Sequence, residues 1–527
     1  MSHHDVVIIG AGFSGMYQLI RLRELGFDVR VVERGSDVGG TWYWNRYPGA
    51  RCDIESIEYS YSFDEQLQQE WDWSERYAAQ PELLAYAQHV AERHDLRPHI
   101  SFDTEVTRME WDEAATRWVV STADGSSLTA TYVIAATGCL SQPSKPQFEG
   151  LPDFAGDVYW TSAWPHDGVD LSGKRVGVVG TGSSGLQTIT AIAPVVGELT
   201  VFQRTPSYAI PAHNGPVGER LGEVRSYYGQ FREASRYTRG GFQCETQQTP
   251  LLELPREQVD AELDRSWAKG GLCFQGVFPD VLRDPQANEV AAEYVRQRIR
   301  ERVKDPEVAE RLIPRTYPIA TKRMCVDTGY YEVFNQDNVS LVDLNEEPIR
   351  RVTPTGILAG ETEHELDVII MATGFDAMTG ALLHMDIRNG DRTLAEKWAH
   401  GPRTYLGLMS EGFPNLFMIT GPQSPSVLSN MMTSIEQHVD WVTRLLAAQR
   451  DQGRTRVEPE PEAEDNWVNA NNDLAEFTLF PRAASWYMGA NIPGKQRILL
   501  PFVGGVDTYK LISDGVAASS YHGFERV

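Results

Sequence analysis

Apolar and polar positions follow the same order at two places in this chain of 527 residues. Residues 5–33 begin with the apolar run VVII, continue with an amphipathic segment of helical period, and end with a second apolar run, VRVV. Residues 174–203 repeat this order with VGVV, the segment LQTITAI and the run LTVF. Such an order indicates a buried strand, a helix and a parallel strand. The pattern therefore predicts an α/β fold with two Rossmann-like domains.

Both units carry a glycine-rich turn between the first strand and the helix. The spacing is Gly-x-Gly-x-x-Gly in each unit, with Gly10, Gly12 and Gly15 in the first and Gly180, Gly182 and Gly185 in the second. These glycines allow a tight turn and a close approach of the backbone to a pyrophosphate at the helix N-terminus. Each unit is therefore interpreted as a dinucleotide-binding site.

The two units differ at the position that contacts the adenosine ribose. Glu33 ends the second strand of the first unit, where an acidic residue accepts hydrogen bonds from ribose hydroxyls. The second unit has Gln203 at the matching place, followed by Arg204 and Thr205. An acid would repel a 2′-phosphate, whereas a neutral residue followed by arginine would accept one. The first site is predicted to bind FAD or NAD, and the second NADP.

Two further buried strands suggest how the two units are connected, because each ends in Ala-Thr-Gly, at Gly138 and at Gly374. Together they predict a flavin domain that holds an inserted NADP domain. A charged stretch rich in helix formers predicts a helical insertion, and the acidic, proline-broken residues 457–467 predict a solvated loop. The expected segments are 1–140 and 385–527 for the FAD domain, 141–213 and 323–384 for the NADP domain, and 214–322 for the helical insertion.

Composition narrows the class of protein. The chain is 41% hydrophobic and 23% charged, its formal charge is −25, and it contains no apolar run of membrane-spanning length. An anionic chain of this kind is not expected to bind nucleic acid or a membrane through its overall field. The polar start without a signal peptide predicts a cytoplasmic protein, and the oligomeric state stays open, with a monomer plausible.

The cysteines and histidines argue against two other chemistries. No two cysteines have the short spacing of a redox pair or a zinc knuckle, and the histidines form no HExxH motif. We therefore expect no metal site and no disulfide reductase activity. All five cysteines are expected to be reduced structural thiols: Cys52, Cys139, Cys244, Cys273 and Cys325.

The stretch DVGGTWYWNRYPGARCDIES follows the first ribose acid, and an aromatic loop packed on the sheet would be one explanation for it. It also resembles the flavin-side motif of the type I Baeyer–Villiger monooxygenases, through Gly40, Trp42, Tyr47, Pro48, Gly49 and Asp53. The segment FAGDVYWTSAWP resembles the fingerprint of the same family at Phe154, Gly156, Trp164 and Pro165, but has Trp160 where the family has histidine. Further stretches resemble the phenylacetone and steroid monooxygenase branch.

The resemblance implies an activity. Members use NADPH and O2, and a C4a-peroxyflavin attacks a ketone to give an ester or lactone. Because the peroxide and its adduct are negative, the site needs a fixed cation in a dry pocket. The match makes Arg323 this cation and Asp53 its partner, and arginine stays charged where lysine would lose its proton. A surface charge and a turn-forming aspartate are the alternative readings of these two residues.

The resemblance also implies the residues around each ligand. Those expected at FAD are Gly10, Gly12, Ser14, Gly15, Glu33, Gly40, Thr41, Trp42, Tyr43, Trp44, Asp53, Tyr59, Val106 and Met431. Those expected at NADP are Gly180, Gly182, Ser183, Ser184, Gly185, Leu186, Gln187, Thr188, Arg204, Thr205, Lys322, Arg323 and Trp486, the last on a segment that could close as a lid. Those expected at the ketone are Cys52, Val427, Leu428 and Met431.

Other functions stay open at this point. A flavin N- or S-monooxygenase would share the two-nucleotide layout, and a non-enzymatic flavoprotein could keep the fold. Aryl ketones, cyclic ketones and steroids are all possible substrates, because the fold and cofactor do not specify the substrate. Trp160 is expected to alter the coupling between the NADP domain and the active site without changing the reaction class, or else to be only a packed aromatic residue.

Overall fold

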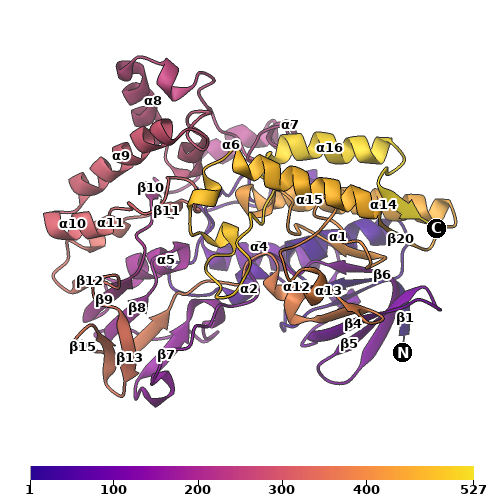
Figure 1. Ribbon diagram of the computed structural model, residues 1–527, viewed down its shortest axis with the longest axis horizontal. Coiled ribbons are helices and arrows are strands. Elements are labelled where there is room, and N and C mark those ends of the chain that lie inside the picture. Colours follow the sequence, from indigo (N-terminus) through magenta and orange to yellow (C-terminus); the bar gives the residue numbers. More distant parts are fainter. Residues whose placement is uncertain (1) are drawn as a thin grey trace.

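The computed structural model describes residues 2–527 and contains two large sheets, which lie side by side in the lower half of Figure 1. The larger sheet has nine strands, one of which, β19 (Leu416–Met418), pairs only with β6. The spatial order of the others is β18 (Arg392–Thr393), β17 (Asp386–Asn389), β4 (Val106–Asp112), β5 (Arg117–Thr122), β6 (Ser127–Ala135), β1 (Ser2–Ile9), β2 (Val29–Val32) and β3 (Ile100–Ser101).

The apolar run at the start of the chain forms β1, which pairs in parallel with β2 and β6. Its end, Val6–Ile9, is buried because helices cover the sheet there. Helix α1 (Phe13–Glu24) follows directly, after Gly10 with a φ of +105°. A Cβ on Gly15 would lie 1.8 Å from the Gly10 carbonyl oxygen. The third glycine of the motif therefore lets the helix pack against the strand end.

The second sheet has five strands, all parallel, and repeats this construction with α5 (Ser183–Ile192) after its central strand. Its order is β12 (Val339–Asp343), β9 (Glu198–Gln203), β8 (Arg175–Val179), β16 (Val368–Met371) and β7 (Asp157–Trp160). A three-stranded meander precedes β16 in the chain and consists of β13 (Ile349–Thr353), β14 (Gly356–Ala359) and β15 (Thr362–Glu365). The chain runs from the larger sheet into the second after β6 and returns after β16.

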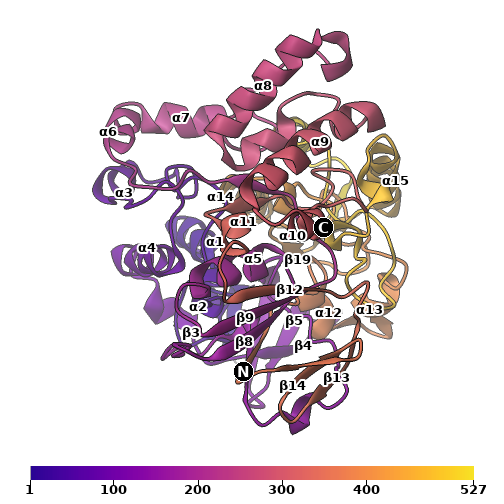
Figure 2. The same cartoon turned by 90° about the vertical axis from the view of Figure 1, so that its left-hand side faces the viewer.

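Helices fill most of the segment between β9 and β12, at one end of the molecule (Figures 1 and 2). A short parallel pair, β10 (Ala209–Pro211) with β11 (Cys325–Asp327), joins the two ends of this segment. Asp284 and Asp305 cap two of the helices and are each followed by a proline, whose missing N–H is not needed at that position. The helices are α6 (Glu219–Arg225), α7 (Tyr228–Ser235), α8 (Arg256–Lys269), α9 (Pro285–Arg302) and α10 (Pro306–Leu312).

Helix α14 (Met431–Asp451) packs along α1, above the larger sheet in Figure 1. Two hydrogen bonds join the helices, from Tyr17 to Asp440 at 2.8 Å and from Gln18 to Thr443 at 2.9 Å. Helix α16 (Val506–Ala518) packs on α14 in turn. Further helices are α2 (Thr41–Trp44), α3 (Glu65–Glu70), α4 (Gln80–Arg93), α11 (Tyr330–Val333), α12 (Gly380–His384) and α13 (Leu394–Lys397).

Residues 457–467 are not a solvated loop, so that sequence interpretation is wrong. They form β20 (Val457–Pro459), which pairs with β21 (Phe524–Arg526), and the start of α15 (Pro461–Glu476). Pro461 lies at the start of the helix, where proline is tolerated. Glu464 is buried and pairs with Lys397 at 2.8 Å. Acids in the first turn suit the positive end of the helix dipole.

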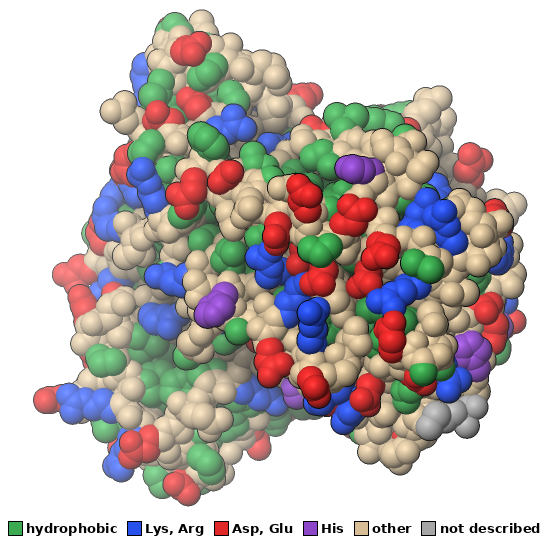
Figure 3. Space-filling model, turned by 45° about the vertical axis from the view of Figure 1, so that its right-hand side comes forward, with side chains coloured by type: hydrophobic (Ala, Val, Ile, Leu, Met, Phe, Trp, Pro, Cys, Tyr) green, Lys and Arg blue, Asp and Glu red, His purple; other side chains and the backbone are tan. Residues whose placement is uncertain are grey.

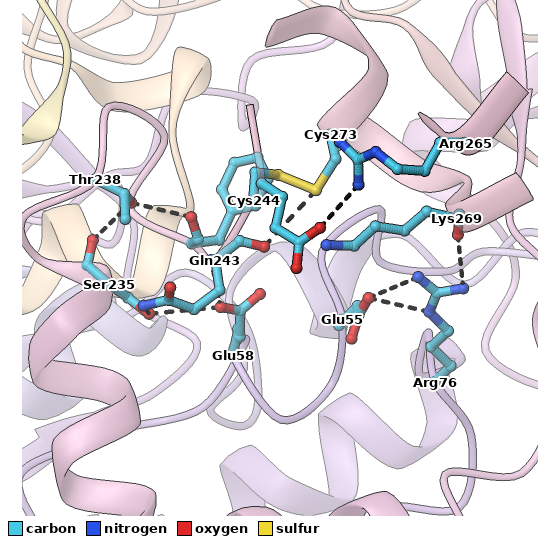
Figure 4. The surroundings of a disulfide bond; sticks show 12 residues. Glu55, Glu58, Arg76, Ser235, Thr238, Gln243, Cys244, Arg265, Lys269 and Cys273 are labelled. Atoms are coloured by element: carbon cyan, nitrogen blue, oxygen red, sulfur yellow. Dashed lines mark hydrogen bonds and ion pairs between the residues drawn. A yellow bond between two sulfur atoms is a disulfide. The ribbon is translucent and has the colours of Figure 1, made fainter. Parts of the chain in front are cut away.

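The expectation of five reduced cysteines is also wrong. Cys244 and Cys273 form a disulfide within the helical insertion (Figure 4), whereas Cys52, Cys139 and Cys325 are buried free thiols. The two bonded residues are 29 positions apart. The sequence spacing does not indicate this pair, because only the fold of the insertion brings the two cysteine-bearing segments together.

Charged side chains of both signs are interspersed on the face that Figure 3 shows. The net charge of −25 is therefore not gathered into one continuous acidic area on that face. Among residues 2–527, no helix combines the length and the apolar character that crossing a membrane requires.

The packing at Gly15 predicts the effect of adding one methyl group. Gly15→Ala should lower the free energy of unfolding by about 1–3 kcal/mol or more, because the new Cβ meets a backbone carbonyl that cannot move aside. Gly222→Ala is the matched control. It lies exposed in α6 with open space around it and should stabilise the protein by about 0.5–1 kcal/mol. Denaturant unfolding measures both, and a Gly15→Ala protein as stable as the parent would contradict the packing argument.

Candidate active site

One cavity of about 1330 Å³ extends between the glycine-rich turns of both sheets. It is lined by Gly10 and Gly12 after β1 and by Gly180 and Gly182 after β8. Both turns follow the carboxyl ends of parallel strands, where ligands of α/β proteins bind. The volume exceeds the roughly 300–1,000 Å³ of a pocket for one drug-sized molecule. The cavity is therefore large enough for more than one ligand.

The Glu33 carboxylate fixes the backbone on two sides of the first nucleotide site. This buried group accepts hydrogen bonds from the backbone N–H of Ala11 at 2.7 Å and of Gly35 at 2.6 Å. A Cβ on Gly40 would lie 2.7 Å from the Gly12 Cα, so two backbone segments meet here without side chains. The fixed acid and the bare backbone fit a dinucleotide with an unphosphorylated ribose.

Two cations mark the second nucleotide site. Neither Arg204 nor Lys322 has an acidic partner within 4.0 Å among residues 2–527, and the Lys322 ammonium lies 4.4 Å from the Tyr317 ring centroid. Burial, and then the charge of Arg204, lowers the pKa of Lys322 to about 8. Two like charges without an acid are costly to bring together. They therefore fit a ligand that carries a phosphate at this place.

Residues 37–56, called the flavin-side loop below, directly contact helix α5, which follows the central strand of the second sheet. A Cβ on Gly49 would lie 2.4 Å from the Gln187 carbonyl oxygen. The Gln187 side chain accepts a hydrogen bond from the Tyr47 hydroxyl at 2.8 Å and donates one to the Arg51 carbonyl at 3.0 Å. These contacts fix the position of the loop relative to the second nucleotide site.

Arg323 and Asp53 form a bidentate ion pair inside the cavity. Arg323 Nε and Nη2 donate to the two Asp53 oxygens at 2.8 Å each, and Nη1 donates to the Val427 carbonyl at 2.8 Å. The side chains are only 15% and 25% exposed. Burial favours the neutral form of the guanidinium, but the Asp53 carboxylate outweighs it and raises the pKa of Arg323 above its ordinary value. The cation is thus permanent and fixed in direction.

Neutral groups surround this pair. Burial, and then the Asp53 charge, raises the pKa of the Cys52 thiol, and burial raises the pKa of Tyr487 to about 12. Both groups stay protonated near neutral pH. Val427 and Met431 add apolar surface to the same wall of the cavity. The arrangement places one fixed cation among neutral and apolar groups.

The cavity brings together almost all of the residues that the sequence suggested. Those that do not line it are Gly15, Tyr43, Gly185, Thr188 and Leu428. The two glycines serve the packing of strand against helix, and Thr188 donates to the Ser184 carbonyl within α5. The Tyr43 hydroxyl bonds Ser36, and Leu428 packs against the same apolar cluster as Val427 without lining the cavity.

Sequence reasoning missed two stretches of the wall. The connector 139–148 and residues 491–493 both line the cavity. The connector follows the Ala-Thr-Gly turn at Gly138, and that position was a signal that the segment passes close to both nucleotide sites. Asn491 is held by a hydrogen bond to the Phe375 carbonyl at 2.8 Å, a contact between distant segments that no local motif reveals.

Trp160 does not reach the cavity. Its half-buried ring packs on the apolar cluster of the second sheet, and the Lys145 ammonium of the connector lies 5.8 Å from the ring centroid. Ser162, two residues further along, lines the cavity. An effect of Trp160 on the site therefore has to pass through the connector or the backbone after β7.

Comparisons with known proteins agree with this geometry. The family model described as "Pyridine nucleotide-disulphide oxidoreductase" matches residues 7–214. The solved structure "Oxidized steroid monooxygenase bound to NADP" aligns with this chain over 100% of both chains, at 48% sequence identity and a TM-score of 0.96. The acetone monooxygenase (methyl acetate-forming) of Gordonia sp. (strain TY-5) is 43% identical over 99% of this chain and 98% of its own. The chain belongs to the Baeyer–Villiger monooxygenases.

Family membership confirms the predicted two-domain α/β fold and the predicted class of enzyme. This Baeyer–Villiger monooxygenase is a flavoprotein that depends on FAD and NADPH. One similar protein has another printed activity: phenazine N-monooxygenase PhzNO1 of Lysobacter antibioticus is 40% identical over 99% of this chain and 98% of its own. A heteroatom substrate is thus compatible with the same fold, although the ketone oxidation has more support.

The depressed pKa of Lys322 predicts a pH dependence that separates NADPH from NADH. The ammonium is charged below about pH 8 and neutral above it, so kcat/KM for NADPH should fall roughly tenfold as the pH rises through that value. NADH lacks the 2′-phosphate and should show no such fall. Lys322→Arg should remove the transition, since arginine stays charged. Steady-state rates with both cofactors measure this, and equal pH profiles would contradict a phosphate contact at Lys322.

Proposed function

We propose that this enzyme inserts one oxygen atom beside the carbonyl of a small apolar ketone, with Arg323 as the catalytic cation. The observation that carries the proposal is the bidentate Arg323–Asp53 pair, which lies in the cavity that both glycine-rich turns line. The Gordonia relative forms methyl acetate from acetone, as its name states, which is an insertion of this kind.

Bound FAD supplies the oxygenation chemistry, which no side chain of the protein can perform. The contribution of Arg323 is electrostatic. Its guanidinium has five N–H donors, and three of them bind Asp53 and the Val427 carbonyl. The other two remain to donate to an oxygen that gains negative charge during the reaction. In a site that excludes water, such a fixed donor stabilises the charge far more than it would in water.

Asp53 orients this cation and sets its strength. Two parallel hydrogen bonds hold the guanidinium plane in one direction, so that little reorganisation is needed when charge develops. Cys52 and Tyr487 stay neutral beside it and add no competing charge. Ketone and oxygen would meet along the wall that contains Cys52, Val427 and Met431.

NADPH binding is assigned to the second nucleotide site. The N-terminus of α5 offers backbone N–H groups and a positive dipole end to a pyrophosphate. Arg204 and Lys322 supply charge for the 2′-phosphate, and Thr205 lines the same part of the cavity. Trp486 lines the cavity on the segment expected to act as a lid.

N-oxidation is the second candidate, because of the phenazine relative. The Arg323 geometry favours the ketone, since addition to a carbonyl turns the carbonyl oxygen into an oxyanion that a fixed cation stabilises. A panel of aliphatic, cyclic, aryl and steroid ketones, run beside phenazines with products identified by mass spectrometry, tests the choice. Ester or lactone products support the proposal, and N-oxides alone would overturn it.

Removal of the Arg323 charge should separate oxygenation from cofactor reduction. Arg323→Ala should lower ester formation by about 100- to 1,000-fold, the usual cost of losing one oxyanion donor. NADPH oxidation should continue with release of hydrogen peroxide, because Arg204 and Lys322 are unchanged. Arg315→Ala, at an exposed ion pair with Glu310, is the matched control and should behave as the parent. Product chromatography with a peroxide assay measures both rates, and normal ester formation by Arg323→Ala would refute the role.

A further inference from the structure

The disulfide lies where the helical insertion meets the flavin side of the molecule (Figure 4). Cys244 and Cys273 are half-buried, whereas the other cysteines are buried thiols. Glu245 and Thr246, next in the chain, are exposed. A reductant dissolved in water therefore reaches this pair before any other cysteine of the described chain.

Residues 239–244, called the strap below, cross from the insertion onto the start of α14. The Gly240 carbonyl accepts a hydrogen bond from the Asn430 N–H at 2.8 Å, and the Gly241 carbonyl accepts one from the Thr433 hydroxyl at 2.8 Å. The Arg239 carbonyl accepts one from the Val506 N–H at 2.9 Å. Successive backbone groups of the strap are thus bonded to the two helices α14 and α16.

A buried carboxylate adds a further anchor. The Gln243 N–H donates to Glu58 at 2.7 Å, and the Asn430 side chain donates to the Glu58 carbonyl at 2.8 Å (Figure 4 shows the first bond). Asn430 also caps α14 by accepting from the Met432 N–H. The strap, the loop before Tyr59 and the first turn of α14 therefore form one bonded unit.

The disulfide ties this unit to the base of the insertion. Cys273 belongs to the 3₁₀ helix Gly271–Gly276, which packs on β10 and β11. Strand β11 begins two residues after Arg323. The other side of the bridge leads through the strap to Met431 and to the segment of Val427, whose carbonyl binds Arg323. The covalent bond thus links the two segments that position the catalytic cation and the wall beside it.

We propose that Cys244–Cys273 is a site of reversible thiol–disulfide exchange that sets how firmly the strap holds the first turn of α14. A dithiol forms its own S–S bond, the Cys244–Cys273 bond breaks, and the two electrons pass to the protein, where each sulfur gains one proton. Lys269 lies in the surroundings of the disulfide, and a cation favours the thiolate through which exchange proceeds; Arg265 there is paired with Glu245 at 2.8 Å.

Reduction should act on ketone binding more than on NADPH binding. The strap bonds directly to α14, whose first residue lines the substrate wall. It is linked to Lys322 only indirectly, through Cys273 and β11, and Arg204 follows β9 of the second sheet. A loosened wall should raise the ketone KM roughly three- to tenfold, the size of coupling between indirectly linked sites. Less ester should form per NADPH oxidised, and the NADPH KM should stay unchanged. These kinetic effects rest on the proposed ketone oxidation.

The first test counts thiols and follows backbone exchange in the FAD-loaded enzyme. Denatured protein should show three free thiols before treatment with dithiothreitol and five after it, with residues 244 and 273 in one cross-linked peptide before reduction. Amide hydrogens of residues 430–434 and of the strap should exchange faster after reduction, while those of α1 stay unchanged. Five thiols before reduction, or unchanged exchange at 430–434, would overturn the proposal whatever the enzyme oxidises.

The second test compares kinetics of the oxidised and reduced holoenzyme. The variant with both Cys244→Ser and Cys273→Ser should behave as the reduced parent and should not respond to dithiothreitol. Gln275→Ser, on the same 3₁₀ helix, keeps the disulfide and should respond as the parent does. Equal ketone KM in the two redox states would overturn the coupling. Absence of ketone turnover in both states would refute the proposed function instead, while the thiol count and exchange still report on the disulfide.

Discussion

The Arg323–Asp53 ion pair joins residues 270 positions apart, and the rest of the structure serves to hold it. A buried ion pair costs desolvation that is recovered only when the geometry is good and the remaining donors are bonded. Here two parallel hydrogen bonds and a third to the Val427 carbonyl meet that requirement. Each partner comes from a different part of the fold, so the flavin-side loop, the base of the insertion and the segment before α14 must all be in register for the pair to form.

The position of Asp53 is itself set by both nucleotide domains. Gly49, four residues earlier, touches the backbone of α5, and Gln187 of that helix binds Tyr47 and the Arg51 carbonyl. A side chain at Gly49 would push the loop away from the helix. A displacement of the second domain is therefore transmitted to the carboxylate that orients the Arg323 guanidinium, with no further element needed between them. The two glycine-rich turns and the Arg323–Asp53 pair thus line the same cavity, and the position of the pair depends on contacts between the two domains.

Features of the fold and the site could be predicted from the sequence where neighbouring residues determine them, and could not where contacts between distant segments do. The glycine turns and the contrast between Glu33 and Gln203 were predictable because motif and backbone requirements fix them. The Arg323–Asp53 pair was expected only from the resemblance to the family, because nothing local joins residues 270 positions apart. The disulfide was not, since it joins two distant segments, and neither was the hydrogen bond of Asn491. Residues 457–467 were misread because prolines suggest a loop, although a strand end and a first helical position both accept them. Leu428 follows a residue of the wall but does not line the cavity itself, which spacing along an irregular segment cannot decide.

Trp160 shows how a departure at a motif position can matter without contact with the ligand. Strand β16 pairs Met371 with Trp160 at the edge of the second sheet, and the ring packs on the cluster beneath that sheet. The charged group near the ring is the Lys145 ammonium of the connector, and Lys145 also lines the cavity.

An indole has one N–H donor and no acceptor, whereas an imidazole has a nitrogen on each side. The ring can therefore attract the connector through its face but cannot bridge two polar groups. At Lys145 the connector meets the ring through a cation–π contact, which constrains direction less than two hydrogen bonds would. The neighbouring Gln142 and Ser144 are held separately, by backbone hydrogen bonds with Asp376 and Gly374. The expected consequence is a weaker hold on Lys145, which lines the cavity, while the Arg323–Asp53 ion pair is untouched.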